Sequence, residues 1–340
     1  MTSRILAAAL AAALLAAVST AAFGSANKLG TAGAQELRIP VGARAAALGG
    51  AMISEVAGVE ALFWNPAGAG NTEATELMFS HQPYIADMDV NYFAVNAPVG
   101  FGTIGASVKV LSVGDMIVTT EDAPEGTGEV TSPTMSVIGL TFSRAMTDRV
   151  LFGVTGMYIN ESILRESANG VAFDFGFQYH PGWRGVKIGL AMKNFGPSMT
   201  FDGPDFERLF LPPDQDPQSQ RRTFKTETKE FELPSSFNFG ISYDTPIGET
   251  SHALISGAFQ SNNFSGDEFK LGGEIGYKNM LFGRASFTAT QQDDYLYDSG
   301  AFGVGFRAGV AGAEVVADYA FVPVSNWFDD VHQFTLRFHF

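Results

Sequence analysis

Cysteine is absent from the 340-residue sequence. Without thiols the chain can form no disulfide, no cysteine-ligated metal site and no cysteine nucleophile. Charged residues are also scarce, at 17% of the chain, and acids outnumber bases by 36 to 21, which gives a formal net charge of −15. This balance argues against a nucleic-acid partner, because phosphate backbones are bound by basic surfaces. It fits loops that face water, and it fits equally well a chain that uses its charge for solubility.

Long apolar runs are lacking after the N-terminus. The uninterrupted run from Ile5 to Val18 follows the early charge of Arg4 and precedes small residues through Ala26. This order is typical of a secretory signal peptide, and the run is shorter than the roughly 18 residues of a spanning helix. We therefore expect residues 1–26 to be a signal peptide, with an N-terminal anchor helix as the alternative. The lack of later helical spans does not exclude a β-barrel, which also pairs every backbone group in lipid.

What the sequence has instead, from about residue 73 onward, is alternation of apolar and polar residues, the pattern of β-strands. In residues 171–179 (VAFDFGFQY), one face carries Val, Phe and Tyr while the other carries Ala, Asp, Gly and Gln. Large aromatics lie near segment ends, as at Tyr179 and Tyr243. A soluble β-sandwich also alternates, but its strands are usually about five or six residues long. Segments of about ten residues with aromatic ends favour a transmembrane barrel.

Connection lengths support the same interpretation. Short turns, such as residues 98–102 and 245–250, alternate with long polar links, such as residues 112–133 and 197–234. Bacterial outer-membrane barrels have short periplasmic turns and longer outer loops. We predict an all-β fold: a transmembrane antiparallel β-barrel of about 14 strands, formed by residues 73–340.

The C-terminus, VHQFTLRFHF, places four large apolar residues on one face of a last strand. A terminal strand that ends in Phe resembles the segment by which outer-membrane barrels are recognised for insertion. The candidate insertion signal consists of Phe334, Leu336, Phe338 and Phe340.

Residues 27–72 break the alternation. Residues 45–48 favour a helix, Gly49 and Gly50 interrupt it, and residues 52–63 suggest a second short helical turn. A short helical unit before the first strand fits the lumen of the barrel, since some barrels are closed by a loop or helix. We expect this segment to be a plug that fills or caps the barrel. The alternative is a periplasmic arm outside it.

The end of this segment, ALFWNPAGAG, contains an Asn-Pro turn. Pro66 fixes its own φ and disfavours a helical conformation for Asn65, so a helix should stop there. We expect Asn65 and Pro66 to return the plug chain to the first strand, with Phe63 and Trp64 anchored against the inner wall. The alternative is that Asn65 and Pro66 only end a helix and have no role in positioning the plug.

The motifs VGARAAALGGA and ALFWNPAG resemble the N-terminal signature of the PorV/PorQ family of outer-membrane proteins, within the wider group of FadL-like barrels. FadL-like barrels have about 14 strands and an N-terminal plug. The resemblance implies that a PorV-like member serves type IX secretion, together with a translocon and secreted cargo. A FadL-like member would instead admit hydrophobic molecules. The motif residues are Gly42, Ala43, Arg44, Ala45, Gly49, Gly50, Trp64, Asn65, Pro66, Ala67 and Gly68.

The sequence therefore predicts a non-enzymatic bacterial outer-membrane protein of PorV/PorQ type that contacts lipid, a secretion translocon and cargo. The alternative is a FadL-like channel for hydrophobic compounds such as long-chain fatty acids. We expect no cofactor and no metal, because the five histidines are scattered without ligand spacing. No catalytic residue is assigned. Four acids on polar strand faces are expected to pair with lumen Lys and Arg: Asp174, Glu274, Glu314 and Asp318.

Overall fold

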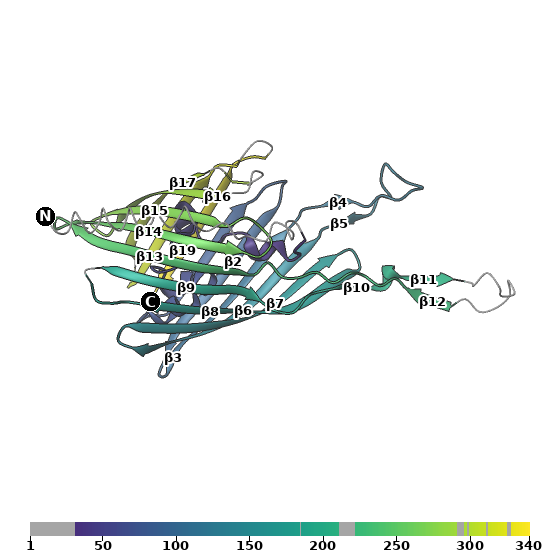
Figure 1. The fold of residues 1–340 in the computed structure, drawn as a ribbon. Coiled ribbons are helices and arrows are strands. Elements are labelled where there is room, and N and C mark those ends of the chain that lie inside the picture. Colours follow the sequence, from purple (N-terminus) through teal and green to yellow (C-terminus); the bar gives the residue numbers. More distant parts are fainter. Residues whose placement is uncertain are drawn as a thin grey trace.

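The computed structural model describes residues 31–183, 185–210, 222–290, 296–297, 299–310, 312–324 and 328–340. Within these residues, one antiparallel sheet has 15 strands, and 14 of them close into a barrel (Figure 1). The predicted fold is therefore confirmed. No helix in the described ranges is long and apolar enough to cross a membrane. The expected signal peptide, residues 1–26, lies outside the described residues.

Each barrel strand pairs with the next barrel strand along the chain, and the last strand pairs with the first. At this closing seam Phe79 lies opposite Leu336. The barrel strands are β1 (Glu76–Pro83), β2 (Asp89–Val99), β3 (Gly102–Ser112), β6 (Thr134–Thr147), β7 (Val150–Ile163), β8 (Glu166–Tyr179), β9 (Val186–Phe195), β13 (Ser236–Ile247), β14 (Ser251–Asn262), β15 (Glu268–Tyr277), β16 (Leu281–Thr290), β17 (Gly300–Val310), β18 (Ala313–Val322) and β19 (Val331–His339).

The alternation in sequence becomes an apolar outside and a polar inside. Phe177 on β8 and Ile275 on β15 are 46% and 62% exposed, although both are large hydrophobic residues. Their neighbours Gln178 and Glu274 point inward and are buried. In water such a surface would promote aggregation, whereas in a bilayer it contacts hydrocarbon.

The two ends of the barrel differ. The connections at the end where β1 begins and β19 ends are all short, which by the rule for bacterial barrels makes it the periplasmic end; the two-residue turn between β7 and β8 lies at the other end. The long links lie at the opposite, outer end, where two hairpins extend beyond the barrel (Figure 1). The elements in these links are β4 (Met116–Ile117), β5 (Val130–Thr131), β10 (Phe201–Asp202), η5 (Pro204–Phe206), β11 (Glu207–Phe210) and β12 (Arg222–Lys225).

The segment before β1 lies inside the barrel and consists of short helical turns. Helix α2 is only five residues long because Gly49 and Gly50 follow it with left-handed φ values of 62° and 75°. Residues 43–69 supply most of the buried apolar core, including Leu48, Met52 and Val56. We call residues 34–71 the plug. Its elements are η2 (Gln35–Arg38), α2 (Ala43–Ala47), η3 (Gly58–Glu60), α3 (Ala61–Trp64) and η4 (Pro66–Gly70).

Candidate functional site

The plug lies directly against the barrel wall at inward-facing glycines. A Cβ added to Gly153 would overlap the backbone of Pro66, and one added to Gly189 would overlap the backbone of Ile53. Since any side chain at these positions would displace plug backbone, the wall is shaped to fit the plug. We call these residues the glycine girdle. Its members, on seven different strands, are Gly105, Gly153, Gly176, Gly189, Gly240, Gly272 and Gly303.

Asn65 joins the plug to the wall. Its Nδ2 donates to the carbonyl oxygens of Ile53, at 2.8 Å, and of Phe177 on β8, at 3.2 Å. Its Oδ1 accepts from the backbone N–H of Ala67, and the residue is fully buried. A backbone carbonyl of the plug and one of the wall thus share a single amide group, which Ala could not replace.

The aromatic pair before Asn65 fills the space between plug and strands. The Trp64 indole donates to the carbonyl oxygen of Val41 at 3.0 Å. Phe63 contacts Trp64 edge to face, with ring centroids 5.1 Å apart, and Tyr92 of β2 at 6.4 Å. Phe63 therefore contacts the inner wall directly, while Trp64 ties two parts of the plug together.

The remaining motif residues are tightly packed. Gly42 has φ 89° and is the N-cap of α2, Gly50 lies under the ring of Trp64, and a Cβ on Gly68 would overlap the carbonyl oxygen of Val56. Pro66 and Ala67 begin η4 and are buried. Gly49 faces Ser286 and Thr288 of β16.

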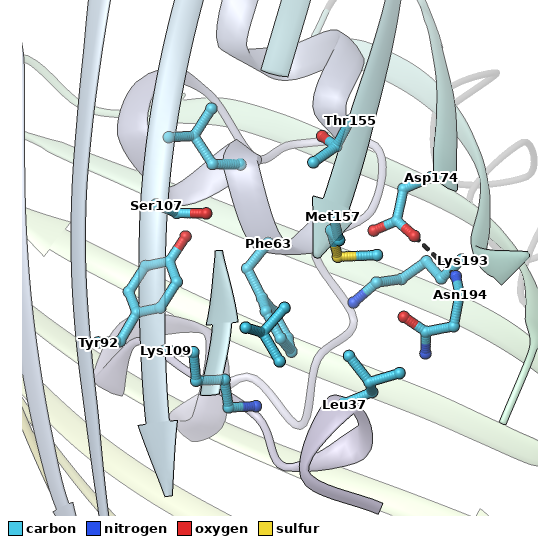
Figure 2. A pocket seen from close by; sticks show the side chains of 12 residues that line it. Leu37, Phe63, Tyr92, Ser107, Lys109, Thr155, Met157, Asp174, Lys193 and Asn194 are labelled. Atoms are coloured by element: carbon cyan, nitrogen blue, oxygen red, sulfur yellow. Dashed lines mark hydrogen bonds between the residues drawn. The ribbon is translucent and has the colours of Figure 1, made fainter. Parts of the chain in front are cut away.

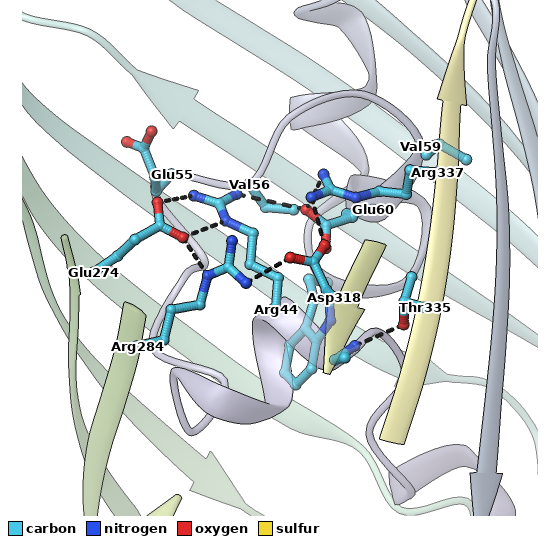
Figure 3. Close-up of polar contacts among 12 residues, drawn as sticks. Arg44, Glu55, Val56, Val59, Glu60, Glu274, Arg284, Asp318, Thr335 and Arg337 are labelled. Carbon is cyan, nitrogen blue, oxygen red and sulfur yellow. Dashed lines mark hydrogen bonds and ion pairs between the residues drawn. The ribbon is translucent and has the colours of Figure 1, made fainter. Parts of the chain in front are cut away.

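Arg44 belongs to a closed ring of six alternating charges (Figure 3). It pairs with Glu274 of β15 at 3.0 Å and with Glu60 of the plug at 3.5 Å. Four wall residues complete the ring, because Arg284 bridges Glu274 to Asp318, and Arg337 bridges Asp318 to Glu60. We call Arg44, Glu60, Glu274, Arg284, Asp318 and Arg337 the charge ring.

The charge ring is buried and neutral. The side chains of Glu60, Arg284 and Asp318 are at most 1% exposed, and three arginines balance three carboxylates. Every ring member has two oppositely charged neighbours, so removal of one leaves two buried charges with a single partner each. Two members come from the plug and four from the wall, so the ring also fixes the position of the plug. A polar cavity of about 140 Å³ borders it towards the periplasmic end and is lined by Glu55, His252 and Arg307 as well.

The four acids predicted to pair with lumen cations separate into three places. Glu274 and Asp318 meet in the charge ring. Glu314 lies near the periplasmic end and pairs with Arg307 at 3.4 Å. Asp174 lies in the outer half of the lumen and accepts from the backbone N–H of Asn194 at 2.7 Å. The described residues contain no group of three or more His, Asp or Glu arranged to hold a metal ion.

A second cavity, of about 30 Å³, lies between the plug segments that carry Leu37 and Phe63 and the barrel strands (Figure 2). Its lining is largely apolar, with Phe63 at its centre and Leu37 and Met157 at its sides. Lys109 and Lys193 enter it from β3 and β9. Two buried lysines beside an aromatic ring are the unusual feature of this part of the lumen.

The outer end of the plug carries a pair of acids. Glu36 of η2 is 1% exposed and lies beside Glu161 of β7. Burial raises the pKa of Glu36 from its ordinary 4.5 to about 8, and the neighbouring Glu161 carboxylate adds to this rise. Lys109 of β3 donates to the carbonyl oxygens of Glu36 and Ile39, and these hydrogen bonds attach residues 36–39 of the plug to the barrel wall.

The C-terminal candidates lie along the lipid-facing side of β19. Phe334 and Leu336 are 50% and 43% exposed, and Phe338 is half-buried. Phe340 follows the strand, is exposed, and its backbone N–H donates to the carbonyl oxygen of Thr75 at 3.0 Å.

Sequence reasoning missed the bulge in β9 and the partners within the charge ring. Strict alternation turns Asn194 outward, yet Lys193 and Asn194 are both buried inside. The inward glycines are the sequence signal that marks close packing between plug and wall.

No protein-family model matches the sequence, and no curated protein matches it. Solved structures do. The toluene transporter TodX of Pseudomonas putida matches with a TM-score of 0.55 at 12% identity, over 87% of this chain and 96% of its own. The toluene transporter TbuX of Ralstonia pickettii matches at 0.53 and 12%, over 88% and 97%. A FadL homologue of Pseudomonas aeruginosa matches at 0.51 and 10%, over 89% and 98%.

This likeness bears on the fold. It supports the wider, FadL-like part of the resemblance seen in the sequence and does not reach the PorV/PorQ part. Barrel, strand number and N-terminal helical segment agree, and the chain has the fold of the FadL-like barrels.

Proposed function

We propose that the protein is a non-enzymatic channel of the bacterial outer membrane that admits small hydrophobic compounds. The observation that carries this proposal is the likeness to toluene transporters and a FadL homologue along nearly the whole of both chains. The apolar cavity beside Phe63 agrees with it, because a lumen that accepts hydrophobic molecules needs an apolar surface inside. This reverses the order of the two functions predicted from the sequence.

The plug bears on how such a channel works. With the glycine girdle in contact with backbone and side chains of the plug, the resting lumen is filled at the level of these glycines. A solute that enters from the outer end meets the cavity beside Phe63 before it meets the girdle. We infer that the cavity is the first stop inside the barrel and that passage beyond it requires the plug to shift.

The test is uptake by cells whose own hydrocarbon channels have been removed. Expression of the protein should increase uptake of labelled toluene or a labelled long-chain fatty acid and leave maltose uptake unchanged. Ser107→Phe, which fills the cavity, should abolish the gain. Val108→Phe, on the lipid-facing side of the same strand, should retain it. Equal uptake with and without the protein would refute the proposal.

A second candidate is the protein-partner function of type IX secretion. The observation that favours it is the hairpin β4–β5, which extends beyond the outer rim (Figure 1) and exposes Met116, Ile117 and Val130. A cross-linked pull-down from the native outer membrane tests it. Recovery of translocon subunits, lost on removal of residues 116–131, would support this function over the channel.

A further inference from the structure

A β-bulge directs two consecutive residues of β9 into the lumen. Phe175 of β8 pairs with Met192, but Phe173 pairs with Phe195, so Lys193 and Asn194 together face Asp174. Asn194 adopts a left-handed φ of 58°, which Asn tolerates better than most residues. Bulges of this kind often lie beside functional sites, where they re-aim a side chain.

The contacts of the bulge leave the ammonium of Lys193 without a hydrogen-bonding partner. The Asp174 carboxylate accepts from the Asn194 N–H at 2.7 Å, and the Asn194 amide donates to the carbonyl oxygen of Pro234 at 3.1 Å. Across the described ranges, the Lys193 ammonium has no hydrogen-bond acceptor and no ion pair within 4 Å, although the Asp174 carboxylate acts on it electrostatically; Lys193 is 8% exposed. Its Nζ lies 3.7 Å from the centroid of the Phe63 ring and 5.6 Å from that of Trp64 (Figure 2).

A second ammonium approaches the same ring. Lys109 Nζ lies 4.9 Å from the Phe63 centroid, and it donates hydrogen bonds to the plug carbonyl oxygens of Glu36 and Ile39. The charges that line the cavity are therefore two lysines and Asp174, an excess of one positive charge. A buried ammonium without a hydrogen-bond acceptor is costly, and a cation–π contact offsets only part of that cost.

We propose that this cavity binds one small monovalent anion, held by Lys193 beside Phe63. A single negative charge matches the single excess positive charge. The volume of about 30 Å³ is enough to hold an ion of the size of a halide or one carboxylate group. The ligand is either a free halide or the carboxylate head group of an amphiphile. This site is independent of the proposed channel function, since a barrel that binds proteins would hold the same cavity.

Trp64 provides the readout, because its ring lies close to Lys193 and is 7% exposed. In a Trp183→Phe, Trp327→Phe background it is the remaining tryptophan of the three in the chain. Bromide, a heavy-atom quencher, should quench it saturably at constant ionic strength, and acetate should compete. Lys193→Met should raise the half-saturating bromide concentration roughly tenfold or more, as expected when a charge-assisted contact is lost.

Lys187→Met is the matched control, since Lys187 lies on the same strand and already pairs with Glu55 at 3.0 Å. It should leave quenching unchanged, and Lys193→Arg should retain it. Heat-modifiable migration on gels establishes that each variant folds. A bromide peak beside Lys193 Nζ in anomalous diffraction would place the ion.

Octanoate and octanol separate the two sources of the anion. If octanoate competes far better than acetate while octanol does not compete, the head group of an amphiphile is the ligand. If octanoate and acetate compete equally, the site takes small free anions. Quenching that is not saturable in the parent protein, or that is the same in Lys193→Met, overturns the proposal.

Discussion

Arg337→Met is expected to loosen the plug while leaving the barrel closed. Arg337 donates to Glu60 and to Asp318, each at 2.8 Å, and both carboxylates are almost completely buried. After the substitution, Asp318 keeps Arg284 at 2.6 Å, but Glu60 keeps only Arg44 at 3.5 Å. The Glu60 carboxylate of the plug is thus left with the weaker ion pair, and it can reach water only if the plug withdraws from the wall.

The size of the effect follows from burial. Breaking one side of a buried ion pair costs about 3–5 kcal/mol. At about 1.4 kcal/mol per factor of ten, this raises the equilibrium population of withdrawn plug by roughly two to four orders of magnitude. The exposed pair Arg165–Asp205, with side chains 68% and 47% exposed, is the comparison. Arg165→Met should change the same equilibrium by about 1 kcal/mol or less.

The absence of cysteine makes the assay simple. Ser54 is fully buried in the plug and its hydroxyl has no hydrogen-bond partner among the described residues, so Ser54→Cys introduces one protected thiol at little cost. Its labelling rate by a water-soluble maleimide reports withdrawal of the plug. The rate should rise strongly with Arg337→Met, and adding Glu60→Gln should lower it again. A rate within about threefold of the parent protein, which corresponds to less than 1 kcal/mol, would refute this account of the charge ring.

Three further predictions follow from other parts of the molecule. Gly176→Val should displace Asn65 and accelerate Ser54→Cys labelling, whereas Gly283→Val, where nothing lies within 4 Å of the added Cβ, should not. The raised pKa of Glu36 means that the docked plug binds a proton that the free segment releases, so docking should weaken as pH rises from about 4.5 to about 8. Hydrogen exchange of residues 34–41 should therefore accelerate over that range, and Glu36→Gln should remove the dependence; a pH-independent parent would contradict it. Ile255→Arg, on the lipid face near the middle of β14, should cost about 2–4 kcal/mol of unfolding free energy in lipid, while Glu249→Arg in the exposed turn should cost almost nothing.

The barrel could be predicted because its physics is local. Each strand must place alternate residues in lipid and in the lumen, so the pattern of residues 171–179 or 237–244 reveals the strand and both its faces. The plug could be expected for a related reason, since Gly49, Gly50 and Pro66 interrupt regular structure in any surroundings.

The contacts within the lumen could not be predicted in the same way. The charge ring joins Arg44 to residues 230 and more positions away, such as Glu274, and its closure depends on the stagger of four strands. The bulge at Lys193 has no glycine to mark it, and the acceptor for its Asn194 N–H is Asp174 on the neighbouring strand β8. The sequence pattern shows which charged residues point into the lumen, but which of them form ion pairs depends on the register between strands.

The position of the plug also constrains the order of biogenesis. Its chain lies at the N-terminal side of β1, whereas the cylinder is completed when β19, the final strand, pairs with β1. Two members of the network that secures the plug, Asp318 and Arg337, reside on the last two strands to be synthesised. The plug therefore gains its last two electrostatic partners only when the C-terminal strands are in place beside β1. Closure of the barrel between β1 and β19 and completion of the charge ring therefore depend on the same two strands. A chain truncated before β18 would have neither a closed barrel nor a complete charge ring.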